Sequence, residues 1–413
     1  MNIMWIVNMV MPELAEHLNI QTGSSGTWMI DISKMLSNRS DVNLAIACVY
    51  GNTYKVEKVN NITYYMLPGN GKNMLFYTKK YETLWKKINS EFKPDIVHLH
   101  GTEYSHGLSF LRVCPNVKAV VSIQGILNRI KDVDFGEIPI RHFIFGRTLR
   151  QNLHLNGEIE MHFIHKKNAK YEKEILQRVQ YVNAVNAWDS SLCKAINPKI
   201  KVFKIEYNLR DELYSSNKWN ADKCEPYTIF TNPGGTPLKG LHNLIEAVAL
   251  LKPKYPNIKL LVPGMGSDGK LVVNSAYSKY IAKLIAKYNL KSNIKFLGRQ
   301  TGTQMCENML KSRITVIPSA IEGTSLILRE SMFLGCPVIA SFRGGMADFI
   351  SDKQDGFLYD YQEVPYLVNR IEMLFEDTNL CKSFSKAAID KATAAHNREK
   401  NISDYLNMYK EII

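Results

Sequence analysis

Residues 314–358 read ITVIPSAIEGTSLILRESMFLGCPVIASFRGGMADFISDKQDGFL and predict a strand, a polar loop, a helix, a second strand and a glycine turn, in that order. The first strand is the β-branched run at residues 314–317, which Pro318 stops. Gly335 ends the helix, and residues 338–340 form the next strand. Strands that alternate with helices in this way build a parallel α/β sheet.

Two carboxylates bracket the start of this helix, for which Thr324 or Ser325 is a suitable N-cap. Glu322 lies in the loop, and Glu330 follows after seven residues, about two turns into the helix. The free N–H groups of Gly323 and its two successors then point between them, and a helix N-terminus favours an anion such as phosphate. A nucleotide sugar, with phosphate at its centre and hydroxyls at both ends, suits such a cradle. A single acidic residue there would only offset the helix dipole.

The stretch resembles the retaining glycosyltransferases of family 4, the glycosyl transferases of group 1, which have the GT-B fold. The resemblance lies in residues 322–330, 335–340, 344–348 and 355–358, and it is looser in the first half of the chain. It implies an α/β protein with two Rossmann-like domains whose parallel sheets face each other across a cleft.

The chain has 413 residues, a length that itself implies two domains of ordinary size. We expect an acceptor-binding domain at residues 1–208, a linker at 209–226 and a donor-binding domain at 227–385. In the resembled fold the last helix, here residues 386–413, packs back on the first domain.

Composition bounds the class of protein. Hydrophobic residues make up 45% and charged residues 22%, which is typical of a globular chain. The net charge of +13 admits nucleic acid, an anionic membrane face or a phosphorylated substrate, but no nucleic-acid-binding module is recognisable. The seven cysteines form no C-x-x-C pair, as in a reducing compartment. The start of the chain reads as a strand, and no apolar run approaches about 18 residues. We therefore expect a cytoplasmic protein, which could also associate peripherally with the cytoplasmic face of the inner membrane.

The first half alternates strands and helices. The predicted strands are residues 3–7, 42–49, 62–66, 96–99, 119–123 and 181–185. Between the first strand and the helix at residues 28–36 lies a loop that carries Gly23 and Gly26, and such a loop lets backbone approach a ligand closely. By resemblance, this glycine loop faces the donor phosphates and the acceptor.

Two strand ends carry polar groups, and ligands of parallel sheets bind at the carboxyl ends of strands. Alternation puts His98 and His100 on one face, where they either bind substrate or are satisfied by backbone. Gln124 follows the next strand, where family 4 enzymes usually carry a histidine that contacts the donor sugar. An amide holds a hydroxyl by hydrogen bonds but cannot take a proton, so the substitution argues against a general base at this position.

Residues 127–170 read as irregular, basic and interleaved with aromatic side chains. Arg129 and Arg141 are among the cations. Such a segment suits anionic lipid headgroups or a lipid-diphosphate acceptor, and a solvated basic loop packed by its aromatics is the alternative. We place these two arginines, with His98 and His100, on the acceptor side.

The second half opens with a strand at residues 227–231 and a loop that contains Gly234 and Gly235. Lys239 stands at the mouth of the following helix, where a lysine is a point charge for phosphate. It resembles the family's phosphate-binding Lys-Gly. The family's arginine six residues earlier is replaced by Pro233. The arginines that could replace this missing cation are Arg210, Arg299 and Arg343.

Gly264 opens a G-x-G-x-x-G match, but the match is not in a first βα unit and no acidic residue stands about 20 positions on to hold a ribose. The resemblance places these glycines in a donor-side loop instead.

The resemblance implies transfer of a sugar, with retention, from a UDP- or GDP-sugar to a glycan or lipid-linked glycan. It suggests bacterial surface polysaccharide assembly as the setting. Glu322, Lys239 and Gln124 are the expected catalytic residues, with no metal or cofactor. The residues expected to bind the donor are Glu330, Gly323, Thr324, Ser325, Leu326, Gly234, Gly235, Gly264, Gly23 and Gly26. A nucleotide-sugar epimerase, a non-catalytic GT-B scaffold and, more remotely, a nicotinamide enzyme are the alternatives.

Overall fold

The computed structural model describes residues 1–20 and 26–413. They divide into two compact units. The first unit comprises residues 1–131, 164–208 and 396–413, and the second comprises residues 132–163 and 209–395.

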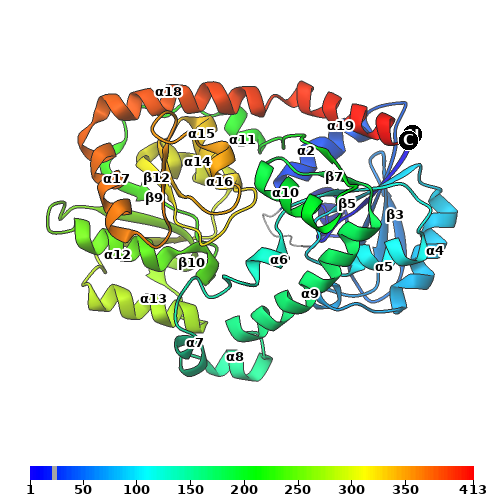
Figure 1. Cartoon of the computed structure of the whole chain (residues 1–413), viewed down its shortest axis with the longest axis horizontal. Coiled ribbons are helices and arrows are strands. Elements are labelled where there is room, and N and C mark those ends of the chain that lie inside the picture. Colours follow the sequence, from blue (N-terminus) through cyan, green and yellow to red (C-terminus); the bar gives the residue numbers. More distant parts are fainter. Residues whose placement is uncertain (21–25) are drawn as a thin grey trace. The chain divides into compact units, whose positions relative to one another are not determined.

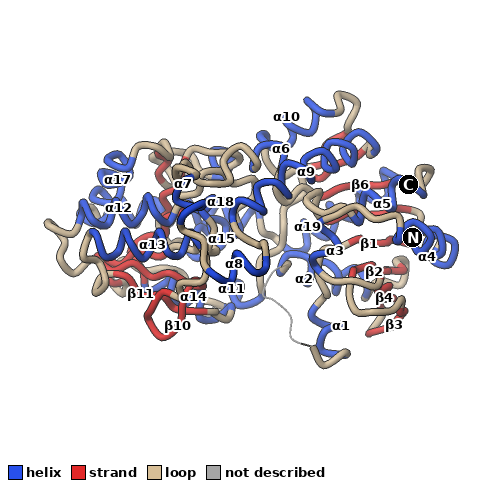
Figure 2. Tube along the Cα trace, turned by 90° about the horizontal axis from the view of Figure 1, so that it is seen from below, coloured by secondary structure: helices blue, strands red, loops and turns tan. Residues whose placement is uncertain are grey.

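The first unit is built on an eight-stranded sheet in the order β3-β4-β2-β1-β5-β6-β7-β8, in which only β3 runs antiparallel to its neighbour. Figure 2 shows β6, β1, β2, β4 and β3 in this succession. The strands are β1 (Asn2–Ile6), β2 (Asn43–Val49), β3 (Lys55–Val59), β4 (Ile62–Leu67), β5 (Ile96–His100), β6 (Ala119–Ser122), β7 (Tyr181–Asn183) and β8 (Lys201–Phe203). The helices are α1 (Pro12–His17), α2 (Thr27–Ser37), α3 (Gly71–Leu75), α4 (Lys80–Phe92), α5 (His106–Val113), α6 (Leu127–Ile130), α10 (Ala187–Ile196) and α19 (Arg398–Ile412), together with most of α9 (Glu158–Arg178).

Both faces of this sheet are covered, as a parallel sheet requires. Along β1, Met4 and Ile6 pack into a cluster with the buried side chains of α4 and α5. Ile3 and Trp5 point to the opposite face, into a cluster with α2 and α19. The period of two along this strand therefore distributes its side chains between two cores.

The C-terminal helix α19 belongs to the first unit. Its Tyr409 hydroxyl lies 3.1 Å from the Trp5 indole nitrogen, which donates to it, and 2.7 Å from His98 Nδ1. All three side chains are fully buried. The last helix thus supplies the hydrogen-bond partner of two buried groups of the sheet, which would otherwise be unsatisfied.

The second unit is built on a six-stranded parallel sheet in the order β11-β10-β9-β12-β13-β14. Figure 1 shows α12 and α13 on one side of its strands and α15 and α18 on the other. The strands are β9 (Glu225–Phe230), β10 (Lys259–Leu271), β11 (Ile294–Gly298), β12 (Ser312–Ile317), β13 (Val338–Ser341) and β14 (Phe357–Tyr359). The helices are α7 (Arg141–Phe145), α8 (Leu149–His154), α11 (Asp211–Ser215), the 3-10 turn η1 (Pro237–Lys239), α12 (Leu241–Leu251), α13 (Ala276–Lys287), α14 (Gly302–Lys311), α15 (Leu326–Leu334), α16 (Met346–Phe349), α17 (Val364–Glu376) and α18 (Thr378–Ala395).

Residues 132–163 depart from the expected organisation, because they group with the second unit although the prediction placed them in the first domain. Two buried groups of the second unit reach back to them. His242 Nε2 lies 2.9 Å from the carbonyl oxygen of Gly136, and the Tyr361 hydroxyl donates to the same oxygen at 2.9 Å. The stretch at 127–170 is also not irregular, since it forms α6, α7, α8 and the first part of α9.

Most of the predicted strands are confirmed, and Gly335 ends α15 in the left-handed conformation expected of such a residue, with φ of +83°. The short edge strands β3, β8 and β14 were not predicted. The single helix expected over residues 386–413 is instead the end of α18 and the whole of α19, which belong to different units.

Replacing Tyr409 with phenylalanine tests the role of α19. The change leaves the Trp5 N–H and His98 Nδ1 without their buried partner, which costs about 1–3 kcal/mol. We expect a lower urea midpoint for Tyr409→Phe and a midpoint within error of wild type for Tyr227→Phe, which alters a side chain that is 37% exposed. Equal midpoints for both variants would show that the buried hydroxyl contributes nothing.

Candidate functional site

The strand order of the second unit creates a ligand site at one place. Numbered within the unit, the order is 3-2-1-4-5-6, and β9 and β12 are the adjacent strands at which it reverses. In such sheets ligands bind beyond the carboxyl ends of these two strands. A cavity of about 280 Å³ lies there. It is lined by residues that follow β9 (Thr231, Asn232, Gly234), by Lys239, by the end of β12 with its loop (Val316, Ile317, Pro318, Ser319, Glu322) and by the start of α15 (Thr324, Ser325, Leu326, Ile327).

Glu322 is positioned by its backbone. Its carbonyl accepts from the Gly345 N–H at 2.7 Å, and it forms a parallel bridge with Gly344. A Cβ on Gly344 would lie 2.1 Å from the Glu322 carbonyl oxygen, and the φ of +70° also favours glycine. The Gly344-Gly345 pair therefore fixes the loop that carries Glu322 to the cavity.

Lys239 is positioned by a similarly close contact. It ends η1, and Gly240 follows with φ of +67°. A Cβ on Gly240 would lie 1.7 Å from the carbonyl oxygen of Pro318, so only glycine lets this loop pack on the end of β12. The Lys239 ammonium pairs with Glu322 Oε1, which also accepts from the Ser319 hydroxyl at 2.9 Å.

The start of α15 offers hydrogen-bond donors to the cavity. Ser325 is the N-cap residue, as predicted, but its side chain caps no backbone N–H. The hydroxyls of Thr324 and Thr231 are buried and have no hydrogen-bond partner among the described residues. Unpaired buried hydroxyls are costly, and both belong to residues that line this cavity. These groups suit a polar or anionic ligand.

Glu330 lies farther along α15 and does not line the cavity. Its side chain is 2% exposed and is paired with Arg210, whose Nη2 lies 2.7 Å from Oε1. Burial raises the pKa of Glu330, and the Arg210 charge opposes that shift. Of the three arginines named from sequence, Arg210 is thus the one bound to Glu330, whereas Arg343 pairs with Asp360 at 3.2 Å.

Of the three glycines predicted to bind the donor in this unit before α15, only Gly234 lines the cavity. Gly234 lines the cavity, and no atom lies within 4 Å of a Cβ built on it. Gly235 has φ of +78°, and a Cβ built on it would lie 3.5 Å from the Met265 side chain, so the loop after β9 lies close to the second half of β10. Gly264 itself does not line the cavity.

The first unit has its own reversal of strand order, between β1 and β5. Gly101 follows β5 with φ of +97°, and a Cβ on it would lie 2.4 Å from Glu103 Oε2 and 3.3 Å from Gln124 Oε1. Glu103 and Gln124 therefore converge beside this glycine. Glu103 Oε2 and Gln124 Nε2 are both buried without a hydrogen-bond partner in the described part of the chain. Gly26 is the N-cap residue of α2, and Gly23 lies outside the described residues.

The four residues expected on the acceptor side are not brought together. The rings of His98 and His100 do share a face, with centroids 4.2 Å apart. His98, however, is a core residue whose two nitrogens pair with Tyr409 and with Ser122 at 2.8 Å. His100 is also buried, and burial lowers its pKa to about 3. Arg129 is exposed on α6 of the first unit, and Arg141 belongs to the second.

Sequence reasoning missed several polar residues of these two sites. Thr231 directly follows β9, and Ser319 stands two positions after β12. A polar residue just beyond the end of a strand is the pattern that would have identified both. Glu103 was missed because it stands three positions beyond its strand, in a turn with no pattern of its own.

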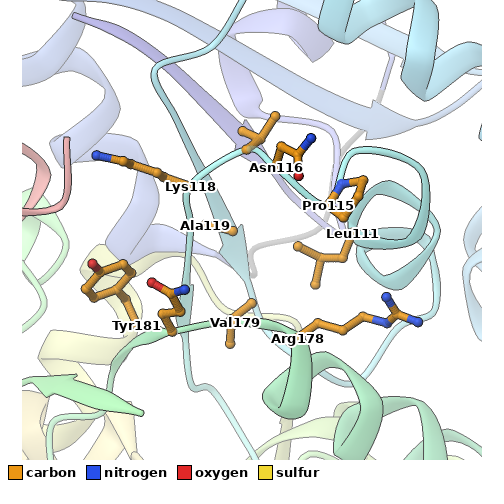
Figure 3. A pocket seen from close by; sticks show the side chains of 10 residues that line it. Leu111, Pro115, Asn116, Lys118, Ala119, Arg178, Val179 and Tyr181 are labelled. Atoms are coloured by element: carbon orange, nitrogen blue, oxygen red, sulfur yellow. The ribbon is translucent and has the colours of Figure 1, made fainter. Parts of the chain in front are cut away.

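A larger cavity, of about 350 Å³, lies in the first unit (Figure 3). Its lining includes Lys118, Ala119, Arg178, Val179 and Tyr181, which stand at the start of β6 and around the start of β7. This is the amino end of the strands, opposite to the edge where parallel sheets bind ligands. We assign it no role in the site.

No group of three or more His, Cys, Asp or Glu side chains among the described residues could hold a metal ion. Within the same residues, no helix combines the length and apolar character needed to cross a bilayer.

Comparison with known proteins agrees with this geometry. Residues 215–391 match the family described as "Glycosyl transferases group 1". The chain is 26% identical over 222 residues to the uncharacterized glycosyltransferase YqgM of Bacillus subtilis (strain 168), covering 54% of this chain and 58% of YqgM. It is 28% identical over 174 residues to the poly(ribitol-phosphate) alpha-N-acetylglucosaminyltransferase of Staphylococcus aureus (strain COL), covering 42% of this chain and 33% of that protein. The matches thus span less than two thirds of either relative's own length.

Solved structures match over nearly the whole chain. The sucrose-phosphate synthase of Thermosynechococcus elongatus superposes with a TM-score of 0.74 at 16% identity, covering 99% of this chain and 98% of the synthase. HepE of Anabaena, solved in complex with UDP and glucose, superposes with a TM-score of 0.68 at 17% identity, covering 99% of each chain. The predicted fold class, a GT-B protein with two Rossmann-like domains, is confirmed. The matched family region, residues 215–391, lies within the second unit, and it holds the cavity beyond β9 and β12.

Glu103 generates a pH prediction. Burial raises its pKa from 4.5 to about 7, so between these values the folded chain keeps a proton that the unfolded chain releases. Stability should therefore fall as pH rises through this window. Glu103→Gln should remove about 1–3 kcal/mol of the loss between pH 5 and pH 8, measured by urea unfolding at both values.

Glu16→Gln is the matched control, because Glu16 is exposed in the same unit. An unchanged pH dependence in Glu103→Gln would mean that Glu103 is ionised in the folded chain across the whole range.

Proposed function

We propose that the protein is a retaining glycosyltransferase that moves a sugar from a nucleotide diphosphate sugar to a glycan or lipid-linked glycan. The observation that carries the proposal is the Lys239–Glu322 pair at the start of α15, at the reversal of strand order in the region that matches group 1 glycosyltransferases. We further propose that the second unit binds the donor and the first binds the acceptor.

Departure of the nucleotide builds negative charge on the leaving phosphate. The Lys239 ammonium and the N–H groups at the start of α15 would stabilise that charge in place of a metal ion. Thr231 and Thr324 would donate their unpaired hydroxyls to phosphate or sugar oxygens.

The two carboxylates take different parts in this proposal. Glu322 would accept from the sugar hydroxyls and offset positive charge that develops on the sugar ring, because it lines the cavity. Glu330 would contact the ribose. Arg210 Nη2 and Arg210 Nε, the latter at 2.8 Å, both donate to Oε1, and we propose that Oε2 accepts from a ribose hydroxyl.

Retention follows if the acceptor attacks from the side of the departing phosphate. The bond between the anomeric carbon and the phosphate oxygen breaks, the bond to the acceptor oxygen forms, and the acceptor proton passes to the leaving phosphate. This route needs no protein base. Gln124 can therefore orient a hydroxyl where family 4 enzymes carry a histidine.

The donor class rests on chemistry and on likeness. HepE was solved with UDP and with UDP-glucose, and this supports a nucleotide sugar, which we propose to be a UDP- or GDP-sugar. The Staphylococcus aureus relative is named for a poly(ribitol-phosphate) substrate, and this supports a polymer of a bacterial surface as the acceptor. A lipid-linked acceptor would place the protein peripherally on the cytoplasmic membrane face.

Removing either member of the pair should abolish most activity. In a panel of UDP- and GDP-sugars, we expect wild type to release UDP or GDP, and Lys239→Ala and Glu322→Gln each to lower the rate by about 10²-fold or more, as lost transition-state stabilisers do. Lys259→Ala is the matched control. It breaks the exposed Lys259–Glu225 pair on the same sheet and should leave the rate unchanged.

The same panel separates the alternatives. An epimerase would convert the sugar of the donor without any acceptor, and a scaffold protein would leave every donor unchanged. Near-normal rates in both site variants would refute the assignment of the site even if the wild type is active.

A further inference from the structure

The helices α7 and α8 expose an unusual amount of apolar surface. Phe145, Leu149, Leu153 and Leu155 are 84%, 83%, 81% and 68% exposed, and Ile144 is 47% exposed. Single exposed apolar side chains are ordinary, but a contiguous group marks a surface that contacts something apolar.

The hydrogen bonds of α8 fix the orientation in which its leucines are exposed. Its Gln151 is only 3% exposed, while its two leucines point outward. Gln151 Nε2 donates to Glu158 Oε2 at 2.8 Å, and Gln151 Oε1 accepts from the Ala276 N–H at 2.8 Å. The helix therefore buries its amide and exposes its leucines, the reverse of a helix in contact with water.

Hydrogen bonds and packing hold the element in place on the second unit. Glu158 Oε1 accepts from the Tyr277 N–H at 3.0 Å, so two side chains of this segment cap the start of α13. Thr148 and Gln151 form a capping box at the start of α8. Phe143 of α7 is 1% exposed within the core of the unit. Figure 1 shows α7 and α8 next to each other at the edge of this unit, below α13.

The exposed charges on this segment are cationic, whereas the nearby carboxylates are already bonded: Glu158 accepts from Gln151, and Glu160 pairs with Arg147 at 2.8 Å. No acidic residue occurs between Glu137 and Glu158. Arg141 and Arg150 are exposed and make no ion pair or hydrogen bond with any described residue. Their guanidinium groups complement an anionic surface, and exposed arginines beside apolar side chains are typical of elements that lie in a lipid interface.

This charge pattern favours a lipid surface over a second copy of the chain. In a two-fold symmetric contact the same patch meets itself, so that a surface carrying Arg141 and Arg150 would face a second surface of the same positive charge. An anionic bilayer instead pairs these cations and buries the leucines.

We propose that α7 and α8 form a membrane-docking element that inserts Phe145, Leu149 and Leu153 into the headgroup region of an anionic bilayer. With six residues, α8 is too short to span a bilayer and would lie in the headgroup region. This proposal rests on the proposed function, because docking on a bilayer would bring the enzyme to a lipid-linked acceptor. The docking surface itself lies outside the donor cavity.

Vesicle sedimentation tests the proposal. Wild type should sediment with vesicles of equal parts phosphatidylcholine and phosphatidylglycerol, and less with phosphatidylcholine alone. The double variant Leu149→Ser/Leu153→Ser should bind the mixed vesicles at least about tenfold more weakly, since each buried leucine contributes strongly to transfer from water. Arg141→Gln/Arg150→Gln should lose the preference for phosphatidylglycerol.

Leu250→Ser is the matched control, because Leu250 is 57% exposed on α12 of the same unit and stands outside the patch. It should bind vesicles as wild type does. Equal vesicle binding by the leucine variant and wild type would overturn the proposal. So would the absence of wild-type binding, or a change from dimer to monomer in the leucine variant, which would identify a second copy as the occupant.

Release of UDP or GDP without vesicles separates this inference from the proposed function. The leucine variant should keep the wild-type rate, which also shows that it is folded. Lost vesicle binding with an unchanged rate supports the docking element alone. A wild type that binds vesicles but leaves every donor unchanged would refute the glycosyltransferase proposal and leave the docking element standing.

Discussion

The ion pair between Lys239 and Glu322 is the interaction on which the candidate site depends. It joins two loops that are 83 residues apart in the chain, one after β9 and the other after β12. The Glu322 side chain is 11% exposed and Lys239 is 32% exposed, so the carboxylate has given up most of its water. Removing the lysine would leave that charge nearly buried and unpaired, which is costly. The pair therefore holds the two loops together and places charged groups on the wall of the cavity.

The backbone makes this pair achievable. Gly240 and Gly344 each stand where a Cβ would clash with a carbonyl oxygen, 1.7 Å from that of Pro318 and 2.1 Å from that of Glu322. Both contacts let a loop close on the end of β12. The residues 132–139 add to the same region, because a Cβ on Gly136 would lie 2.3 Å from the carbonyl oxygen of Pro237 in η1. Loop packing at these glycines thus supports the lysine from two sides.

The sequence was most informative where local signals agree. The β-branched run of β12, the N-cap at Ser325 and the glycine at 335 identified β12 and α15, and the lysine after the glycine loop identified the cation. What sequence could not show depends on contacts between distant residues. The Arg210–Glu330 pair joins residues 120 positions apart, and the burial of His98 depends on Tyr409, 311 positions away. The strand β3, with the sequence KVEKV, was missed because charged residues protect an edge strand and make it read as a loop. The placement of residues 132–163 depends on His242 and Tyr361, which no pattern within the segment reveals.

A crystal structure of the protein with bound UDP or GDP tests the central claim most directly. The account predicts the diphosphate in the cavity beyond β9 and β12, within hydrogen-bond distance of Lys239 Nζ and of the backbone N–H groups at the start of α15. A nucleotide bound elsewhere, or one that leaves both Lys239 and the start of α15 without a phosphate contact, would contradict it.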